Sequence, residues 1–281
     1  MQIAIRALDE SLNLQKNKKP LIHCISNLVS ARELAEGILS YNGKPVISSS
    51  IEEISDITSK CDCLLINLED LNTSKVDAIE KSIRVAKRKG ISVILDLTGI
   101  NFSFLRKESA LKFLNRYNIN VIKGKIEEFE VLINHDKKLS NKDFTECKLK
   151  ESICDVVKLK GFSKRYSTIV VVQFGDYYVT DGFSELSIKS YNNQLKNILG
   201  IEKILLGLIS VGVATASDNE EIFRAVLVAI MTIAVSEKIV VQKNLEPEKN
   251  IWLKEYLLDE IKKIDSEKLS KLSKVNYFFM R

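Results

Sequence analysis

Two groups of residues in this sequence have the types and spacing to bind a phosphate or a cation. The first is the stretch GIEKILLGLISVGVA, in which Gly200 precedes a long run of small and aliphatic residues. Such a run predicts a buried helix. The first turn of a helix offers free backbone N–H groups and the positive end of the helix dipole, and both favour an anion. Glu202 and Lys203 lie in this predicted turn, so their charges decide whether a phosphate is accepted.

The second group is a pair of carboxylates, Asp96 and Glu128, each of which ends or follows a predicted buried strand. Proteins hold magnesium through one or two carboxylates together with phosphate oxygens and water, so this pair is a candidate magnesium site. The alternative is structural. Asp96 would cap a loop, and Glu128 would belong to the first turn of a helix, where the dipole stabilises a negative charge. Position alone favours the structural interpretation.

The sequence has few residues for other metal sites or for nucleophilic catalysis. The five cysteines have no repeated spacing, and Cys61 and Cys63 lead into a predicted buried strand, so we expect them to pack in the core. The only histidines are His23 and His135, which disfavours a zinc centre or a Ser-His-Asp hydrolase. The first residues lack the apolar core of a signal peptide, which favours a reducing cytoplasm.

The composition argues against nucleic acid and membrane partners. The 42 Lys and Arg residues exceed the 37 Asp and Glu residues by five, a mild excess over 281 residues. The lysine clusters lie in segments that are typical of solvated helix faces or loops, without the aromatic residues of a base-stacking surface. No segment of about 20 apolar residues is present to span a membrane. We therefore expect a cytoplasmic protein that binds small molecules.

The elements that must position the candidate residues alternate between short apolar strands and helices. Predicted strands cover residues 20–26, 44–48, 62–67, 92–96, 119–123 and 168–173, followed by a hairpin over 177–190. After an amphipathic N-terminal helix, further helices are predicted at 28–42, 73–89, 106–117, 125–133, 149–161, 201–216, 219–240 and 250–264. This alternation predicts an α/β protein with a mostly parallel sheet covered on both faces. The polar stretch 134–147 is a candidate surface loop, and we predict one domain over residues 1–281.

In parallel sheets, ligands bind beyond the carboxyl ends of the strands. The polar residues that directly follow the predicted strands are therefore the candidates for a site. They are His23, Asn27, Ser48–Ser50, Asn67, Glu69, Asp96, Thr98, Lys123–Glu128 and Gln173–Asp176.

The order of several segments resembles the hydroxyethylthiazole kinase family, whose members have a ribokinase-like fold. The similar segments are KKPLIHCISNLVSARELAEGILSYNGKPVISSSIEEISDI (18–57), LLINLEDLN (64–72), GISVILDLTGINFSFLRKESALKFL (90–114), INVIKGKIEEFEVL (119–132) and VTDG (179–182). The resemblance implies a three-layer α/β/α kinase that uses ATP and Mg²⁺. It also implies that the substrate is the primary hydroxyl of 4-methyl-5-(2-hydroxyethyl)thiazole, and that the protein is a homotrimer with thiazole sites between subunits.

Several functional positions carry over from the resemblance. Ile47 falls where the family packs a methionine on the thiazole, and Asn27 matches an asparagine of the first loop. Asp96 falls on the aspartate that helps to hold magnesium through water, and Glu128 matches the glutamate of an Asn-x-x-Glu motif. Lys123 takes the place of an arginine that contacts the nucleotide.

The departures from the family pattern concentrate in the phosphate-binding loops. The loop DLTGIN (96–101) has lost a proline and a glycine, and Gln173 replaces a phosphate-binding threonine. The asparagine of Asn-x-x-Glu is Lys125. The family's Gly-Thr-Gly-Cys anion hole aligns with GIEK, which leaves Gly200 in place and puts Lys203 at the catalytic cysteine. Residues with a Cβ approach a phosphate less closely than glycine, so these changes predict a weakened nucleotide site.

Lys203 admits two interpretations. Its ammonium could stabilise charge on the transferring phosphoryl group, as positive groups do in kinases. The more ordinary interpretation is a solvated lysine at the start of a helix, where the dipole is mildly unfavourable. The function accordingly has three hypotheses. The first is a hydroxyethylthiazole kinase with altered site chemistry, and the second is a catalytically impaired paralogue that binds a small molecule or a partner subunit. The third is a related kinase that acts on a different alcohol, which Ile47 and the serines at 48–50 leave open.

Overall fold

The structure, a computed structural model, describes residues 5–135, 151–191, 195, 200–243 and 253–277. Within these ranges nine strands form one sheet in the order β2-β1-β3-β4-β5-β6-β7-β8-β9. The strands are β1 (Leu21–Ile25), β2 (Lys44–Ile47), β3 (Cys63–Asn67), β4 (Ser92–Asp96), β5 (Val121–Lys125), β6 (Ile169–Phe174), β7 (Asp176–Thr180), β8 (Glu185–Ile188) and β9 (Val275–Tyr277).

The sheet is parallel from β2 to β6 and antiparallel from β6 to β9, which confirms the prediction of a mostly parallel sheet. Its central register is important for function. Asn67 at the end of β3 pairs with Asp96 at the end of β4, and Asp96 pairs with Lys123 of β5. Three polar residues thus lie next to one another at the carboxyl edge of the sheet.

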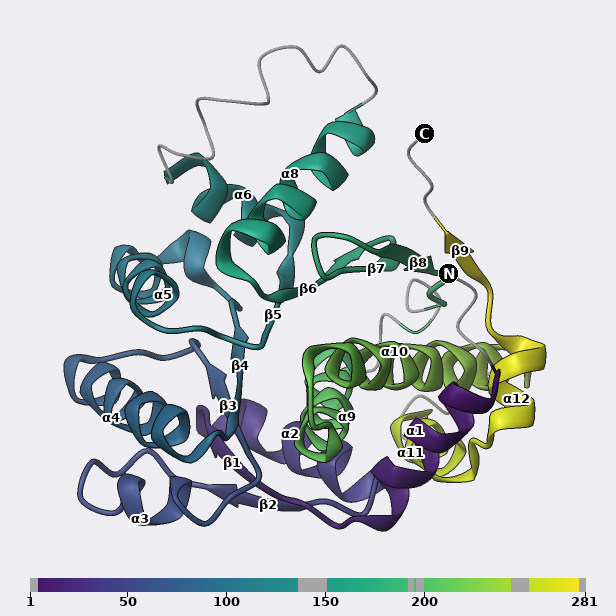
Figure 1. Cartoon of the computed structure of the whole chain (residues 1–281). Coiled ribbons are helices and arrows are strands. Elements are labelled where there is room, and N and C mark those ends of the chain that lie inside the picture. Colours follow the sequence, from purple (N-terminus) through teal and green to yellow (C-terminus); the bar gives the residue numbers. More distant parts are fainter. Residues whose placement is uncertain (1–4, 136–150, 192–194, 196–199, 244–252, 278–281) are drawn as a thin grey trace.

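Helices cover both faces of the sheet, as Figure 1 shows, so the predicted three-layer α/β/α architecture is confirmed. One layer contains α1 (Ile5–Asn17), α2 (Leu28–Ser40), α9 (Ile201–Thr215), α10 (Asn219–Gln242), α11 (Leu253–Lys263) and α12 (Ser266–Leu272). The other contains α3 (Ile54–Thr58), α4 (Thr73–Lys89), the 3₁₀ helix η1 (Ile100–Phe102), α5 (Phe104–Arg116), α6 (Ile126–His135) and α8 (Glu151–Tyr166).

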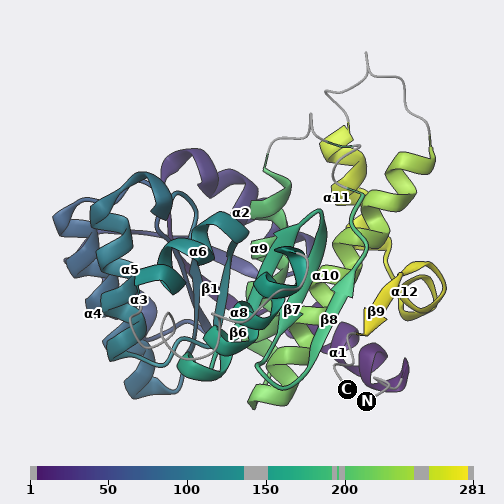
Figure 2. The same cartoon turned by 90° about the horizontal axis from the view of Figure 1, so that it is seen from above.

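Helix α9, which contains the apolar run, is buried between the sheet and other helices. It packs directly on α2, and the two helices lie side by side in Figures 1 and 2. A Cβ atom added to Gly37 of α2 would lie 2.3 Å from the carbonyl oxygen of Ile204, a distance that no side chain can occupy. Glycine at this position therefore allows the two backbones to touch, which fixes where α9 begins relative to the sheet.

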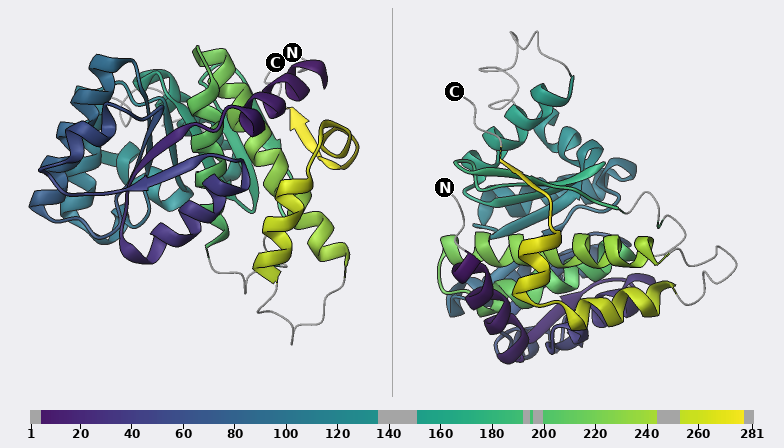
Figure 3. Two further views of the ribbon diagram at one scale, coloured as in Figure 1. Left: turned by 90° about the horizontal axis from the view of Figure 1, so that it is seen from below. Right: turned by 90° about the vertical axis from the view of Figure 1, so that its right-hand side faces the viewer.

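Helix α10 is the long apolar helix of the same layer, and α11 and α12 pack against it (Figure 3). In the described part of the chain it alone is long and apolar enough to cross a membrane, with a mean hydropathy of 1.8. However, 78% of that apolar window is buried inside the fold, as expected for a core helix.

The predicted elements agree with the structure apart from short pieces. Sequence periodicity missed α3, η1, α12 and β9, because elements of three to seven residues contain too few positions to show a period. Residues 149–150 and 250–252 of two predicted helices lie outside the described residues. The hairpin over 177–190 is confirmed as β7 and β8. The candidate loop 134–147 lies almost entirely outside the described residues.

Candidate active site

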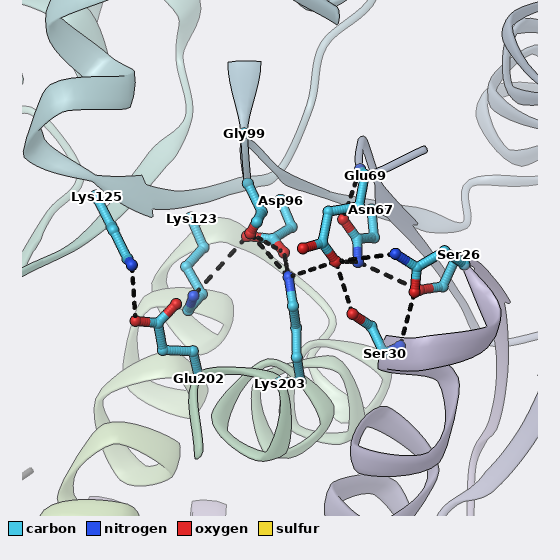
Figure 4. Close-up of polar contacts among 12 residues, drawn as sticks. Ser26, Ser30, Asn67, Glu69, Asp96, Gly99, Lys123, Lys125, Glu202 and Lys203 are labelled. Atoms are coloured by element: carbon cyan, nitrogen blue, oxygen red, sulfur yellow. Dashed lines mark hydrogen bonds and ion pairs between the residues drawn. The ribbon is translucent and has the colours of Figure 1, made fainter. Parts of the chain in front are cut away.

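The candidate site lies where the carboxyl ends of β3, β4 and β5 meet the start of α9. Asp96 is the last residue of β4, which lies between β3 and β5, and it is fully buried. Lys203 lies in the first turn of α9, directly opposite (Figure 4). The fold therefore brings together two predicted site residues that are separated by 107 positions in the sequence.

The ammonium of Lys203 lies among three oxygen atoms. Its Nζ is 2.6 Å from Asp96 Oδ2, 2.8 Å from Thr98 Oγ1 and 3.5 Å from Glu69 Oε2. Thr98 in turn donates a hydrogen bond of 2.8 Å to Asp96 Oδ2. Lys203 is only 7% exposed, so the interpretation of Lys203 as a solvated helix residue is wrong.

The charges of this cluster support one another. Burial alone would raise the pKa of Asp96, but the charges of Lys203 and Lys123 outweigh it and hold the pKa below its ordinary value. Burial likewise disfavours the charged form of Lys203, yet the Asp96 carboxylate raises the pKa of the ammonium above its usual range. Both groups are therefore ionised at neutral pH.

Glu69 is the second carboxylate beside Lys203, and residues from β3 and α2 hold it in place. Its Oε2 accepts hydrogen bonds from the hydroxyl of Ser30 at 2.6 Å, Nδ2 of Asn67 at 3.1 Å and Nδ2 of Asn27 at 3.3 Å. Burial raises the pKa of Glu69, but the Ser30 hydroxyl and the Lys203 charge lower it by more, so the pKa lies below its ordinary value. Glu69 therefore adds a second negative charge beside Lys203.

Asn27 has a double role in this arrangement. Its Oδ1 accepts the backbone N–H of Ser30 at 2.7 Å and so caps α2, while its Nδ2 reaches Glu69. A side chain that caps a helix in this way satisfies one of the N–H groups that the first turn leaves free. The predicted substrate residue thus lies at the rim of the cluster.

Lys123, the predicted nucleotide contact, is buried at the opposite side of Asp96. Its Nζ lies 3.8 Å from Asp96 Oδ1, which is an ion-pair distance but too long for a hydrogen bond. Asp96 Oδ1 is buried and has no hydrogen-bond partner within the described residues. The carboxylate is therefore hydrogen-bonded on one oxygen only.

Glu128 lies in the first turn of α6 and supports the loop after β4. Its Oε1 accepts the backbone N–H of Gly99 at 2.6 Å, and its Oε2 accepts that of Lys125 at 2.8 Å. Burial raises the pKa of Glu128, although these two backbone hydrogen bonds oppose the shift. With both oxygens engaged, Glu128 has the contacts of the structural interpretation, and a magnesium ion at the predicted Asp96–Glu128 site would have to replace these contacts.

Gly200 begins α9 in a conformation that favours glycine. Its φ is +85°, and an added Cβ would lie 2.2 Å from Cγ of Glu33. No side chain of the described residues caps this helix start. Glu202, the carboxylate expected to repel a phosphate, is paired with Lys125, whose Nζ lies 3.5 Å from Glu202 Oε1. This ion pair reduces the negative charge at the start of α9.

Two predicted residues lie farther along the edge of the sheet. Ile47 ends β2, three strands from Asp96, which corresponds to roughly 14 Å at a strand spacing of about 4.8 Å. Gln173 on β6 is two strands away on the other side, or roughly 10 Å. Neither residue joins the Asp96 cluster in this chain.

Some of the residues that complete the cluster could be listed as candidates from the sequence. Glu69, Asn67 and Thr98 end or follow strands at the carboxyl edge of the sheet, but their positions did not indicate what each one does. Ser30 could not be identified from the sequence, because it lies in the first turn of α2 and reaches Glu69 only because β1, the strand before α2, pairs with β3.

Comparison with known proteins places this chain in a family. The model of the family described as "Hydroxyethylthiazole kinase family" matches residues 12–267, which is most of the chain. The chain belongs to the hydroxyethylthiazole kinase family. This confirms the resemblance that was identified from the order of sequence segments. The members of the family are phosphotransferases.

Individual relatives of this kinase family agree in length and fold. The hydroxyethylthiazole kinase of Clostridium perfringens is 28% identical over 266 residues, which cover 95% of this chain and all of the relative. The structure of the hydroxyethylthiazole kinase protein from Pyrococcus horikoshii OT3 has a TM-score of 0.83 at 20% identity, covering 98% of this chain and all of that chain. A ribokinase-like superfamily protein from Enterococcus faecalis has a TM-score of 0.57 at 10% identity, over 92% and 95% of the two chains. The fold is therefore ribokinase-like.

In this chain, the cluster offers a positive charge next to a helix start. Phosphoryl transfer depends mainly on positioning and on neutralising the charge of the phosphoryl oxygens. Lys203 and the start of α9 can supply this neutralisation, while Asp96 and Glu69 hold the ammonium in place.

Proposed function

We propose that this protein transfers the γ-phosphoryl group of ATP to the primary hydroxyl of 4-methyl-5-(2-hydroxyethyl)thiazole, a reaction of thiamine salvage. One observation carries the proposal: Lys203 is held against Asp96 at the start of α9, at the carboxyl edge of the sheet. A positive group held there by a buried carboxylate suits a phosphoryl acceptor site. The family membership supplies the reaction class.

In the proposed reaction, the hydroxyl oxygen forms a bond to the γ-phosphorus while the bond from that phosphorus to the β–γ bridging oxygen breaks. ADP leaves with the electron pair of that bond, and the hydroxyl proton passes to water. The Lys203 ammonium, held by Asp96, Thr98 and Glu69, contributes its positive charge beside the transferring phosphoryl group. The backbone N–H groups of the first turn of α9 contribute to the same charge stabilisation.

Magnesium enters this proposal as part of the Mg·ATP substrate. The residues around Asp96 do not fit a resident magnesium ion held by the protein, because one Asp96 oxygen accepts from Lys203 and Thr98 and the other faces Lys123. Both oxygens of Glu128 accept backbone N–H groups. No three of His, Cys, Asp and Glu converge in the described parts of the chain.

The remaining assignments are also proposals. Lys123 and Gln173 lie on the β5–β6 side of Asp96, where they would contact the nucleotide. Asn27 and Ile47 lie on the β1–β2 side, where they would contact the thiazole. Ile47 is 43% exposed, and the nearby start of α2 exposes the apolar residues Leu28 and Val29. Exposed apolar residues beside the proposed thiazole contacts support a subunit interface there, as in a homotrimer that forms thiazole sites between subunits. We place this enzyme in the cytoplasm.

The test is detection of the phosphorylated thiazole by mass spectrometry after incubation of the purified protein with Mg·ATP. A matched substrate that carries an ethyl group in place of hydroxyethyl is the control, because it fills the site but offers no acceptor oxygen. The expected result is one phosphate added to the hydroxyethyl compound only, with equal ADP release. A folded protein that forms no phosphorylated product would overturn the proposal and favour the hypothesis of an impaired paralogue.

A further inference from the structure

The contacts of Lys203 are oxygen atoms of the kinds that bind a cation. A carboxylate oxygen of Asp96, a carboxylate oxygen of Glu69 and the hydroxyl oxygen of Thr98 surround its Nζ at 2.6, 3.5 and 2.8 Å. Hard divalent cations in proteins prefer this kind of donor, oxygen atoms from carboxylates and neutral groups. Here the ammonium of the chain itself lies at the centre of the oxygen atoms.

Burial makes a cation at this position necessary. Asp96 is fully buried and Glu69 is half-buried, and two carboxylates that share a site repel each other unless a positive charge lies between them. Lys123 approaches Asp96 only from the far side, at 3.8 Å from Oδ1. Lys203 is therefore the group that bridges the two carboxylates, as Figure 4 shows.

Asp96 also has an oxygen atom that its protein partners leave unsatisfied. Oδ1 is buried and accepts no hydrogen bond within the described residues. A buried carboxylate oxygen without a donor is rare, since most buried polar atoms are paired. The second carboxylate oxygen could thus take part in binding an ion once the ammonium no longer held the group in place.

We infer that the Lys203 ammonium occupies a cation position formed by Asp96, Glu69 and Thr98, so that this chain takes no divalent ion there and becomes able to do so when the ammonium is removed. Because this is the site of the proposed function, the inference rests on that proposal for its meaning in catalysis. Metal binding, however, can be measured without turnover, so the two can fail separately.

The inference has a kinetic corollary for the wild-type protein. If Lys203 supplies the positive charge beside Asp96, divalent metal is needed only to form Mg·ATP. The rate should then follow the concentration of Mg·ATP and show no additional rise when free Mg²⁺ is increased. A second, saturable activation by free Mg²⁺ would contradict the inference.

The direct test is a Mn²⁺ titration of the full chain without nucleotide, in which electron paramagnetic resonance measures the free ion. Lys203→Ala removes the ammonium and leaves space for an ion and its water. Lys203→Arg keeps the charge. Lys125→Ala is the matched control, because it removes a lysine that pairs with Glu202 on the same rim but does not touch Asp96. Lys203→Ala with Asp96→Asn removes the main ligand.

We expect Lys203→Ala to bind one Mn²⁺ at least about tenfold more tightly than wild type, since a charge contact near 3–4 Å in a partly buried site exceeds a factor of ten. The Arg variant, the Lys125 control and the double variant should bind no more tightly than wild type. Equal binding by wild type and Lys203→Ala would overturn the inference. The wild-type titration is decisive even if the Ala variant does not fold: a tight Mn²⁺ ion that Asp96→Asn abolishes would refute it.

Discussion

The Lys203–Asp96 pair makes a quantitative prediction for stability. Lys203→Met removes the ammonium but keeps the length of the side chain, which leaves Asp96 as a buried carboxylate. Breaking a buried ion pair from one side costs 3–5 kcal/mol, and we expect about 3 kcal/mol because Thr98 and Lys123 still face the carboxylate. Asp96→Asn leaves Lys203 with Glu69 and should cost about 2 kcal/mol.

The double variant should cost less than the sum of the two single variants, because neither charge is then left alone. A cost of about 3 rather than about 5 kcal/mol gives a coupling energy of about 2 kcal/mol. The free energies come from urea unfolding followed by far-ultraviolet circular dichroism. Costs that add to within about 0.5 kcal/mol would refute the reasoning, since uncoupled residues behave in that way.

The same cycle has a pH dependence with a defined sign. In wild type, the pKa of Asp96 is lowered by its two lysines, so its contribution is present above the pKa of the unfolded chain and is lost as pH falls through the folded value. In Lys203→Met, burial acts on Asp96 with less opposition and raises its pKa. The penalty of this variant should therefore shrink as pH falls towards the raised pKa, because protonation removes the buried charge. A penalty that is independent of pH would argue against a buried, uncompensated carboxylate.

Three further predictions concern groups that support the site. Glu128→Gln should lower the free energy of unfolding by about 1–2 kcal/mol, because one backbone N–H loses its acceptor, whereas the exposed neighbour Glu127→Gln should change it little. Gly200→Ala should cost clearly more than Gly90→Ala in urea unfolding, since both have positive φ but only Gly200 also lacks space for a Cβ. The His23 ring should titrate in NMR with a pKa of about 4, which is lowered mainly by burial. The stability that neutral His23 contributes is therefore full above its unfolded pKa of about 6.5 and is lost as the pH falls from about 6.5 to about 4. A ring that titrates near 6.5 would contradict this prediction.

Much of the fold follows from the sequence, because the buried strands are short and uniformly aliphatic. The segments LLIN and SVILD could be assigned to a covered sheet without tertiary information, since only strands buried on both faces lose the alternation of polar and apolar residues. The long apolar run of α9 likewise predicted a buried helix. Short elements such as β9 escaped, because their pairing with β8 depends on contacts distant in sequence.

The chemistry of the site was only half visible in the sequence. In the sequence, Glu202 and Lys203 are recognisable only as replacements of residues in the family's glycine-rich phosphate loop. In the fold, each lies next to an opposite charge: Lys203 contacts Asp96, and Glu202 contacts Lys125. These partners are far apart in sequence, so only the register of the sheet and the placement of α9 reveal that the changes complement each other.

The complementary charges are what a rebuilt site, rather than a decayed one, would show. Random loss of a phosphate loop would leave unpaired charges at a buried helix start, which is costly. Here the half-buried Glu202 and the buried Lys203 both have partners. This pattern supports a kinase whose phosphate site uses a lysine in place of backbone groups.

The measurement that tests this account most directly is the single-turnover rate of thiazole phosphorylation by wild type, Lys203→Arg and Lys203→Met at saturating Mg·ATP. If Lys203 neutralises the transferring phosphoryl group, the Met variant should be slower by about 10²–10³, the usual effect of losing one preorganised charge-stabilising group. The Arg variant should retain most of the rate. A Met variant that is folded and turns over as fast as wild type would contradict the central role of Lys203.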